Sequence, residues 1–504
     1  MFKNFQGFHL VEDYHVWKKS HREKKNPLNL KILKLSIAVL IPLIVLWLPS
    51  DAFGIAGLTV IQHRVIAVFV FAALMWLFDA VPAWTTSLMV VVLLLFGVSD
   101  SSLWFMRETV SGEGVGTLVS YKSILHCFAD PIIMLFIGGF IIAIAATKSG
   151  LDVRLARTML KPFGTKSENV MLGFIFVTAV FSMFISNTAT AAMMLTFLAP
   201  VLKALPADGK GKIGLALAIP VGANVGGIGT PIGTPPNAIA LKYLNDPAGM
   251  DMGIGFGHWM GIMMPLAIVL LVIAWIVLKT LFPFKQKTIH LKIESNHQSS
   301  WRDYVVYITF AVTVLLWMCD AFTGVNANVV AMLPVGVLCI TGVITKRDLE
   351  EISWSILWMV AGGFALGVAL QESGLASAMI ESIPFSTWSP IWVILGSGIL
   401  CWLMANFISH TATAALFIPI LAVAGMSMKE ALTGIGGVGT LLIGVAVSSS
   451  LAMLLPISTP PNALADATGL IKQKYMVIVG LIMGLVGLLL GYLTLIFCGS
   501  NNML

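Results

Sequence analysis

Two short segments rich in hydroxyl and amide side chains are near copies of one another. Residues 186–192 read SNTATAA and residues 409–415 read SHTATAA, and apolar sequence surrounds both. Serine and threonine hydroxyls, an asparagine amide and free backbone N–H groups can each bind a carboxylate oxygen. The same oxygens are hard ligands that suit a small cation such as Na⁺. The two segments therefore indicate a site where an organic anion and a cation lie close together and offset each other's cost of leaving water.

Each copy belongs to a longer repeated pattern. TPPNA occurs at 234–238 and again at 459–463, and GGF at 138–140 recurs at 362–364. Serine and threonine inside helices commonly bond the carbonyl four residues earlier, which would be enough to explain one isolated motif. A duplicated pair of motifs instead indicates an internal repeat, and in a membrane protein such repeats are typical of transporters.

Composition places the chain in a membrane. Hydrophobic residues make up 58% of the 504 residues and charged residues only 11%, whereas an ordinary soluble domain carries about 25% charged residues. The net charge of +6 fits basic loops on the cytoplasmic side of a membrane better than nucleic-acid binding, because lysine and arginine lie mostly between apolar segments. The five cysteines have no paired spacing, which argues against a disulfide framework or a zinc site. We therefore predict an all-α polytopic membrane protein.

Apolar stretches predict eleven membrane crossings, since a helix needs roughly 20 residues to cross the hydrocarbon core. They lie near 32–50, 57–81, 83–98, 131–148, 213–243, 257–282, 303–318, 328–345, 354–371, 433–467 and 473–498. Two further stretches, 168–202 and 388–422, are too long for one helix and too short for two full crossings. We interpret them as re-entrant helical hairpins, each with one copy of the hydroxyl-rich motif at a tip that is buried in protein.

Glycine and proline interrupt two of the predicted spans. The spans at 213–243 and 433–467 contain the runs 226–236 and 448–461, where proline removes a backbone donor and glycine favours non-helical backbone. Half-helix N-termini attract anions, and freed carbonyls can coordinate Na⁺. Broken helices at matching positions of two repeats therefore indicate a binding site near the middle of the membrane.

The distribution of lysine and arginine places the N-terminus in the cytoplasm and makes the two halves inverted repeats. Residues 1–30 are basic and amphipathic, which fits either a helix on the anionic lipids of the inner leaflet or a partly disordered tail. The rest divides into a first transmembrane helix at 31–56, a first inverted repeat at 57–282, a cytoplasmic linker at 283–302, a second inverted repeat at 303–498 and a tail at 499–504.

With its paired SNT and TPP motifs, the chain resembles the divalent anion/sodium symporter family, the bacterial relatives of the solute-carrier di- and tricarboxylate transporters, over essentially everything after residue 30. The resemblance implies an elevator-type homodimer, in which a transport domain with both hairpins and both broken helices slides against a scaffold domain. It implies a first Na⁺ site at Ser182, Ser186, Asn187 and Gly229. It also implies that the tips bind substrate carboxylates, and the expected substrate site comprises Ser186, Asn187, Thr188, Thr234, Pro235, Ser409, His410, Thr411, Thr459 and Pro460.

The second motif departs from the family pattern at two positions. His410 stands where the family has asparagine, and Ala405 stands where a hydroxyl residue is common. Both changes remove oxygen ligands from a second Na⁺ site. A protonated His410 could replace the missing positive charge, and a neutral one could donate a hydrogen bond to the substrate. Ionisable groups inside membranes are usually functional, which favours a role in coupling.

Three mechanisms fit these residues. The first is Na⁺-coupled transport of a di- or tricarboxylate of the succinate, malate, fumarate or oxoglutarate type across the cytoplasmic membrane, with citrate, tartrate and sulfate still open. The second is a sodium-independent dicarboxylate exchanger in which His410 replaces the second cation. The third is an anion channel, because inverted repeats and re-entrant segments also build channels. No enzyme activity and no organic cofactor are expected, because no nucleophile–base or nucleotide-binding constellation accompanies the repeats.

Overall fold

The structure is a computed structural model that describes residues 28–55, 57–108, 116–205, 209–247, 249–289, 300–382 and 387–504. The regular elements of these ranges are helices, with no strand among them. Most of the N-terminal segment expected at 1–30, and residues 290–299 of the expected linker, lie outside the described residues.

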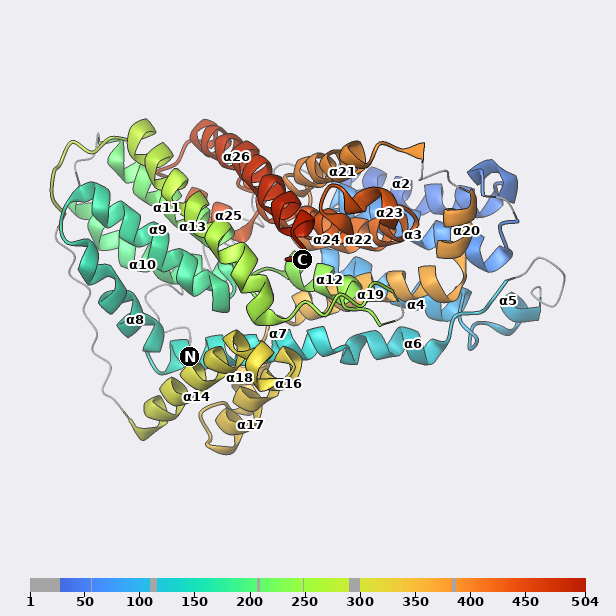
Figure 1. Cartoon of the computed structure of the whole chain (residues 1–504), viewed down its shortest axis with the longest axis horizontal. Coiled ribbons are helices and arrows are strands. Elements are labelled where there is room, and N and C mark those ends of the chain that lie inside the picture. Colours follow the sequence, from blue (N-terminus) through green and yellow to red (C-terminus); the bar gives the residue numbers. More distant parts are fainter. Residues whose placement is uncertain are drawn as a thin grey trace.

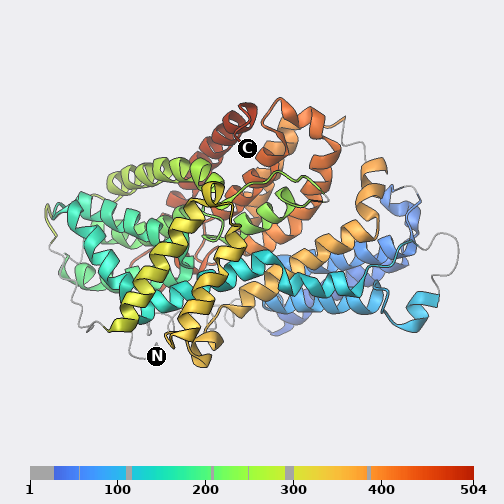
Figure 2. The ribbon, with the colours of Figure 1, turned by 60° about the horizontal axis from the view of Figure 1, so that its bottom comes forward.

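The first half of the described chain begins with helices that lie at one end of the molecule's long axis and continues to a helix pair at the other end (Figures 1 and 2). Its elements are α2 (Leu28–Trp47), η2 (Ser50–Phe53), α3 (Val60–Phe78), α4 (Ala83–Gly97), α5 (Trp104–Glu108), α6 (Tyr121–His126), η3 (Cys127–Ala129), α7 (Pro131–Lys148), α8 (Leu151–Leu160), η4 (Lys161–Phe163), α9 (Ser167–Phe184), α10 (Asn187–Ala204), α11 (Gly211–Gly227), α12 (Pro235–Leu244) and α13 (Phe256–Leu281).

The second half repeats the same order of long helices. Its elements are α14 (Trp301–Met318), α15 (Asp320–Thr323), α16 (Ala327–Val330), α17 (Met332–Ile340), α18 (Lys346–Glu350), α19 (Trp354–Glu372), α20 (Leu375–Ser382), α21 (Pro390–Ala405), α22 (His410–Ser427), α23 (Lys429–Thr433), α24 (Gly437–Ser450), α25 (Pro460–Ala467) and α26 (Gln473–Ser500).

Nine helices of the described ranges are long and apolar enough to cross a membrane, and five shorter apolar helices accompany them. The nine include α9 and α22, which the sequence analysis assigned to hairpins rather than to crossings. Large apolar side chains on the outer faces are exposed, for example Leu40, Ile44 and Leu489. Such a surface requires lipid around it.

The segments expected to be hairpins and broken helices are interrupted in the structure. The stretch at 168–202 is divided between the contacting helices α9 and α10, and the stretch at 388–422 contains α21 and the first part of α22, which also contact one another. The span at 213–243 stops at Gly227 and resumes at Pro235, and the span at 433–467 stops at Ser450 and resumes at Pro460. Proline suits the first helical turn because its missing N–H would have no intrahelical partner there.

The two halves interlock at these interruptions. Helix α10 of the first half contacts α25 of the second, and α22 of the second half contacts α12 of the first. Each hydroxyl-rich tip therefore begins a helix that packs against the TPP half-helix of the other repeat.

The repeated double glycines place α7 and α19 against two different sets of neighbours. A Cβ atom added to Gly138 would lie 2.2 Å from the Ala331 carbonyl oxygen, and one added to Gly362 would lie 2.4 Å from the Ser87 side chain. The second glycine of each pair faces a different kind of neighbour: Gly139 faces the first interruption, and Gly363 faces the helix that begins at the second tip. A Cβ atom on Gly363 would lie 2.7 Å from that of Ala415 in α22, whereas one on Gly139 would lie 3.6 Å from Ile232.

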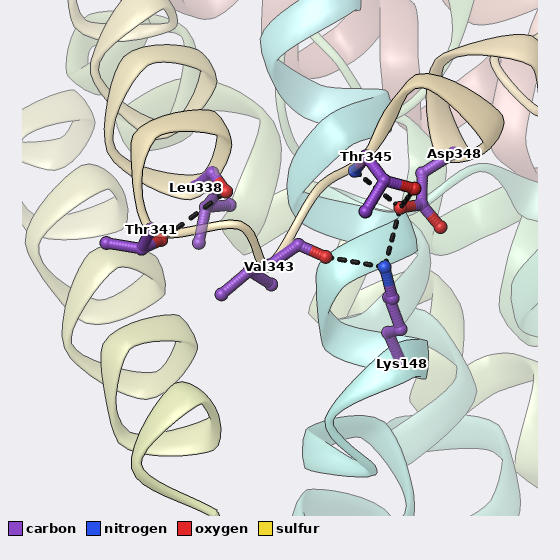
Figure 3. A network of polar contacts seen from close by, with 6 residues as sticks. All are labelled: Lys148, Leu338, Thr341, Val343, Thr345 and Asp348. Atoms are coloured by element: carbon purple, nitrogen blue, oxygen red, sulfur yellow. Dashed lines mark hydrogen bonds and ion pairs between the residues drawn. The ribbon is translucent and has the colours of Figure 1, made fainter.

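An ion pair joins the end of α7 to α18, the short helix that precedes α19 (Figure 3). Lys148 Nζ lies 2.6 Å from Asp348 Oδ2 and donates to the Val343 carbonyl at 2.5 Å. Thr345 donates to the same carboxylate oxygen through its backbone N–H and its hydroxyl. At the opposite end, the Ser120 backbone N–H before α6 donates to Glu372 Oε2 at the end of α19. The run from α6 to α7 in the first repeat is thus connected at both ends to the run from α18 to α19 in the second.

Candidate functional site

The first tip presents Ser186, Asn187 and Thr188 at the start of α10. The Ser186 hydroxyl caps the helix by accepting from the Ala189 N–H at 3.3 Å. All three side chains are partly exposed, so a ligand can reach them. Helix N-termini favour anions because their first N–H groups are unpaired and the helix dipole points its positive end there. The tip is therefore suited to a carboxylate.

Three oxygen atoms lie together directly behind this tip. Ser182 Oγ is 2.5 Å from Asn187 Oδ1 and 2.8 Å from the Ala223 carbonyl oxygen in α11. The hydroxyl carries one proton, so it can donate to only one of these acceptors at a time. Ser182 is fully buried. Hydroxyl, amide and carbonyl oxygens gathered in this way are the ligands that a small hard cation prefers.

The glycine that lies against Asn187 is Gly227. A Cβ atom at Gly227 would be 3.0 Å from Asn187 Oδ1, whereas one at Gly229, the predicted ligand, would meet Met183 at 2.9 Å. Gly229 lies two residues beyond the end of α11. The structure thus brings Ser182 and Asn187 together, next to the helix cap Ser186, and places Gly227 against Asn187.

Each interruption is held open by the asparagine of its TPPN motif. Asn237 Nδ2 donates to the carbonyls of Gly227 and Thr230 at 3.0 and 2.8 Å. Asn462 Nδ2 does the same for Met453 and Leu455 at 2.8 and 3.1 Å. These bonds satisfy carbonyls that the interrupted helix cannot satisfy by itself.

The predicted TPP residues lie at the starts of the resumed helices. Thr234 and Thr459 are the N-caps of α12 and α25, and Pro235 and Pro460 are the first residues of these helices. Both threonines are buried.

The second tip differs from the first in its polar contacts. Ser409 again caps its helix, by accepting from the Ala412 N–H at 3.1 Å. His410 Nε2 lies 2.7 Å from the Ala452 carbonyl oxygen, and because a carbonyl can only accept, Nε2 carries the hydrogen. Ala452 and Gly227 each precede the asparagine of their TPPN motif by ten residues. The imidazole thus donates to a carbonyl whose counterpart in the first repeat is Gly227, the glycine that lies against Asn187.

Ala405 and Thr411 at this tip are buried, and the sequence analysis missed two polar residues beside them. Asn406 Oδ1 accepts from the Leu454 N–H at 2.8 Å, and the Ser458 hydroxyl donates to the Asn406 carbonyl at 2.9 Å. Their bonds tie the second tip to the second interruption.

A third missed residue joins the repeats. Asn224 in α11 donates through Nδ2 to Asn462 Oδ1 at 3.3 Å and to the Thr459 hydroxyl at 3.4 Å. The sequence signal that could have identified Asn224 is an asparagine inside an apolar run, because a buried amide requires hydrogen-bond partners.

The fold and site together define a polytopic membrane transporter. The chain belongs to the citrate transporter family, whose model matches residues 73–435. This confirms the resemblance to divalent anion/sodium symporters.

Three relatives show what this chain is similar to. It is 31% identical to an uncharacterized transporter of Haemophilus influenzae, over 84% of this chain and 88% of the relative. It is 30% identical to the sodium-dependent dicarboxylate transporter SdcS of Staphylococcus aureus, over 82% of each chain. It is 28% identical to the sodium-dependent high-affinity dicarboxylate transporter 3 of Caenorhabditis elegans, over 85% of this chain and 81% of the relative.

Proposed function

We propose that this protein carries dicarboxylates of the succinate type across the cytoplasmic membrane and couples their movement to Na⁺ bound behind the first tip. The observation that carries this proposal is the oxygen cluster of Ser182, Asn187 and Ala223 behind the partly exposed start of α10. A cation in that cluster offsets the desolvation of a dianion at the tip, so the two bind best together. Two of the relatives are named as sodium-dependent dicarboxylate transporters, which supports both the dicarboxylate and the Na⁺ of this proposal.

The proposed movement is an elevator. The transport domain comprises the hairpins α9–α10 and α21–α22, the broken helices α11–α12 and α24–α25, and the adjoining α13 and α26. The scaffold comprises α3, α4, α7, α14, α17 and α19 and forms the homodimer contact in the membrane. The hairpins are re-entrant, the repeats 57–282 and 303–498 are inverted, and the N-terminus is cytoplasmic.

Uptake of labelled succinate into proteoliposomes, with and without an inward Na⁺ gradient, tests the coupling. Ser182→Ala removes one oxygen from the cluster and is expected to raise the Na⁺ concentration for half-maximal uptake about tenfold, the effect of a loss of roughly 1.4 kcal/mol. Thr196→Val is the matched control, because its hydroxyl donates to the Ala192 carbonyl of its own helix. Equal uptake by the unaltered protein with and without the Na⁺ gradient would overturn the symport proposal. Saturable uptake distinguishes either carrier from a channel.

One observation favours a second candidate, a sodium-independent exchanger. The His410 N–H already occupies the Ala452 carbonyl at the second tip, which removes that oxygen from a second Na⁺ site. The exchanger then requires a protonated His410 to supply the positive charge of the missing cation. An exchanger takes up labelled succinate only when dicarboxylate is present inside the vesicles. The same assay, run with empty and with succinate-loaded vesicles, separates the two candidates.

A further inference from the structure

The end of α12 is docked against the scaffold by three contacts of different kinds. Lys242 Nζ lies 2.5 Å from Asp130 Oδ2 at the start of α7. The same ammonium group lies 3.7 Å from the centre of the Phe364 ring in α19. Both members of the ion pair are largely buried, where a charge pair is screened less than at a surface.

The second contact is one of shape. The Tyr243 hydroxyl reaches α19 at Gly367, where an added Cβ atom would lie 1.8 Å from the hydroxyl oxygen. Only glycine leaves room for the ring in this position. The hydroxyl is buried and has no hydrogen-bond partner within the described residues, so packing alone keeps it there.

The third contact lies just beyond the end of α12. Gln371 Nε2 at the end of α19 donates to Asp246 Oδ2 at 3.3 Å. Lys242, Tyr243 and Asp246 thus reach α7 and α19 together, while the other end of α12 begins at the TPP motif. A ten-residue helix is about 15 Å long, so the docked end and the candidate site belong to one rigid piece.

We propose that these residues form a latch that holds the transport domain in the conformation seen here and must open in every transport cycle. The proposal rests on the elevator movement proposed above, because α12 belongs to the moving domain and α7 and α19 to the scaffold. Sliding of α12 along α19 withdraws Lys242 from Asp130, Tyr243 from Gly367 and Asp246 from Gln371 in one step. The latch therefore sets the population of this conformation relative to the others.

Cysteine cross-linking measures the latched population without relying on transport. Asp246→Cys and Gln371→Cys are introduced together in full-length protein whose exposed Cys339 is changed to serine, and the pair is bridged with a short, reducible bifunctional thiol reagent. Adding Lys242→Gln is expected to slow cross-linking about fivefold, which is the lower end of the range of typical coupling between two sites of a protein. An unchanged rate would overturn the latch.

Lys279→Gln is the matched control. Lys279 also pairs with a carboxylate, Glu168 at 3.8 Å, and lies 3.9 Å from the Trp275 ring centre, but its partners in α9 and α13 belong to the same moving domain. It is expected to leave the cross-linking rate unchanged, and an equal slowing would overturn the assignment. Asp130→Asn still offers an oxygen that can accept from the Ile132 N–H, as the Asp130 carboxylate does at the start of α7. It should slow cross-linking as Lys242→Gln does, with no further slowing in the double variant.

Transport provides the second readout. Complete cross-linking is expected to abolish succinate uptake in proteoliposomes, and reductant to restore it. Uptake that continues in fully cross-linked protein overturns the latch and the elevator movement on which it rests, and leaves the proposed Na⁺-coupled dicarboxylate transport intact. If protein without cross-links takes up no succinate under any gradient, the proposed function fails, while the cross-linking rates still report on the latch.

Discussion

At the scale of single residues, the second tip has His410 in place of Asn187 and Ala405 in place of Ser182, and the first of these differences decides what the Ala452 carbonyl contacts. Asn187 gives the first tip an amide oxygen beside Ser182, whereas His410 gives the second tip an N–H that donates to Ala452. A cation cannot use a carbonyl lone pair that a hydrogen bond already occupies without displacing the donor. The two tips therefore share a serine-capped helix start but differ in the polar groups that they offer to a ligand.

His410→Asn is expected to make uptake more dependent on Na⁺, because the shorter amide releases the Ala452 carbonyl and restores an oxygen at this position. The measurement is uptake against Na⁺ concentration at two pH values. His63→Asn is the matched control, since the His63 ring also contacts a backbone carbonyl, that of Val45, at 2.6 Å. If His410→Asn leaves both the Na⁺ and the pH dependence of uptake unchanged, His410 has no part in coupling.

At the scale of elements, the interruptions could be predicted from sequence and their contacts could not. Proline and glycine disfavour helical backbone within their own turn. The runs at 226–236 and 448–461 therefore predict where a helix stops. Which glycine faces Asn187 depends on how α11 packs against the tip, and Gly227 and Gly229 are equivalent as local signals. The Asn224 contact joins residues separated by 238 positions, and no local pattern encodes such a pairing.

The double glycines give an element-scale prediction. Gly363→Ala is expected to lower the free energy of unfolding by about 1–3 kcal/mol, because its new methyl group would overlap Ala415 in α22 and overpacking has roughly that cost. Gly139→Ala has space at 3.6 Å from Ile232 and should stabilise α7 by about 0.5–1 kcal/mol through helix propensity. Thermal unfolding in detergent measures both, and equal effects would contradict the predicted packing difference.

At the scale of the whole molecule, two contacts join the run from α6 to α7 with the run from α18 to α19. Lys148 at the end of α7 pairs with Asp348 in α18, and the Ser120 N–H before α6 donates to Glu372 at the end of α19. Burial raises the pKa of Asp348, but hydrogen bonds from Lys148 and Thr345 lower it by more, so the pKa lies below its ordinary value of 3.8. A carboxylate whose folded pKa is depressed stabilises the fold above its unfolded pKa and loses that contribution as the pH falls through the folded pKa.

Asp348→Asn is therefore expected to lower the melting temperature at pH 7, by an amount that corresponds to about 3 kcal/mol for breaking a buried pair. The difference from the unaltered protein should shrink only when the pH falls below about 4, where the unaltered carboxyl also becomes protonated. Glu350→Gln, at an exposed position of the same short helix, serves as the control. A difference that is the same at pH 7 and pH 3 would show that Asp348 acts through packing instead of charge.

The bond from Asn224 to Thr459 also constrains biosynthesis. The two residues are 235 positions apart, and ribosomes add about 5–20 residues per second, so the amide waits roughly 10–50 seconds in the membrane for its partner. During that time α11 carries an unpaired polar group among apolar neighbours. Lipid, water or the insertion machinery must therefore accommodate this amide until the segment that contains Thr459 has been made.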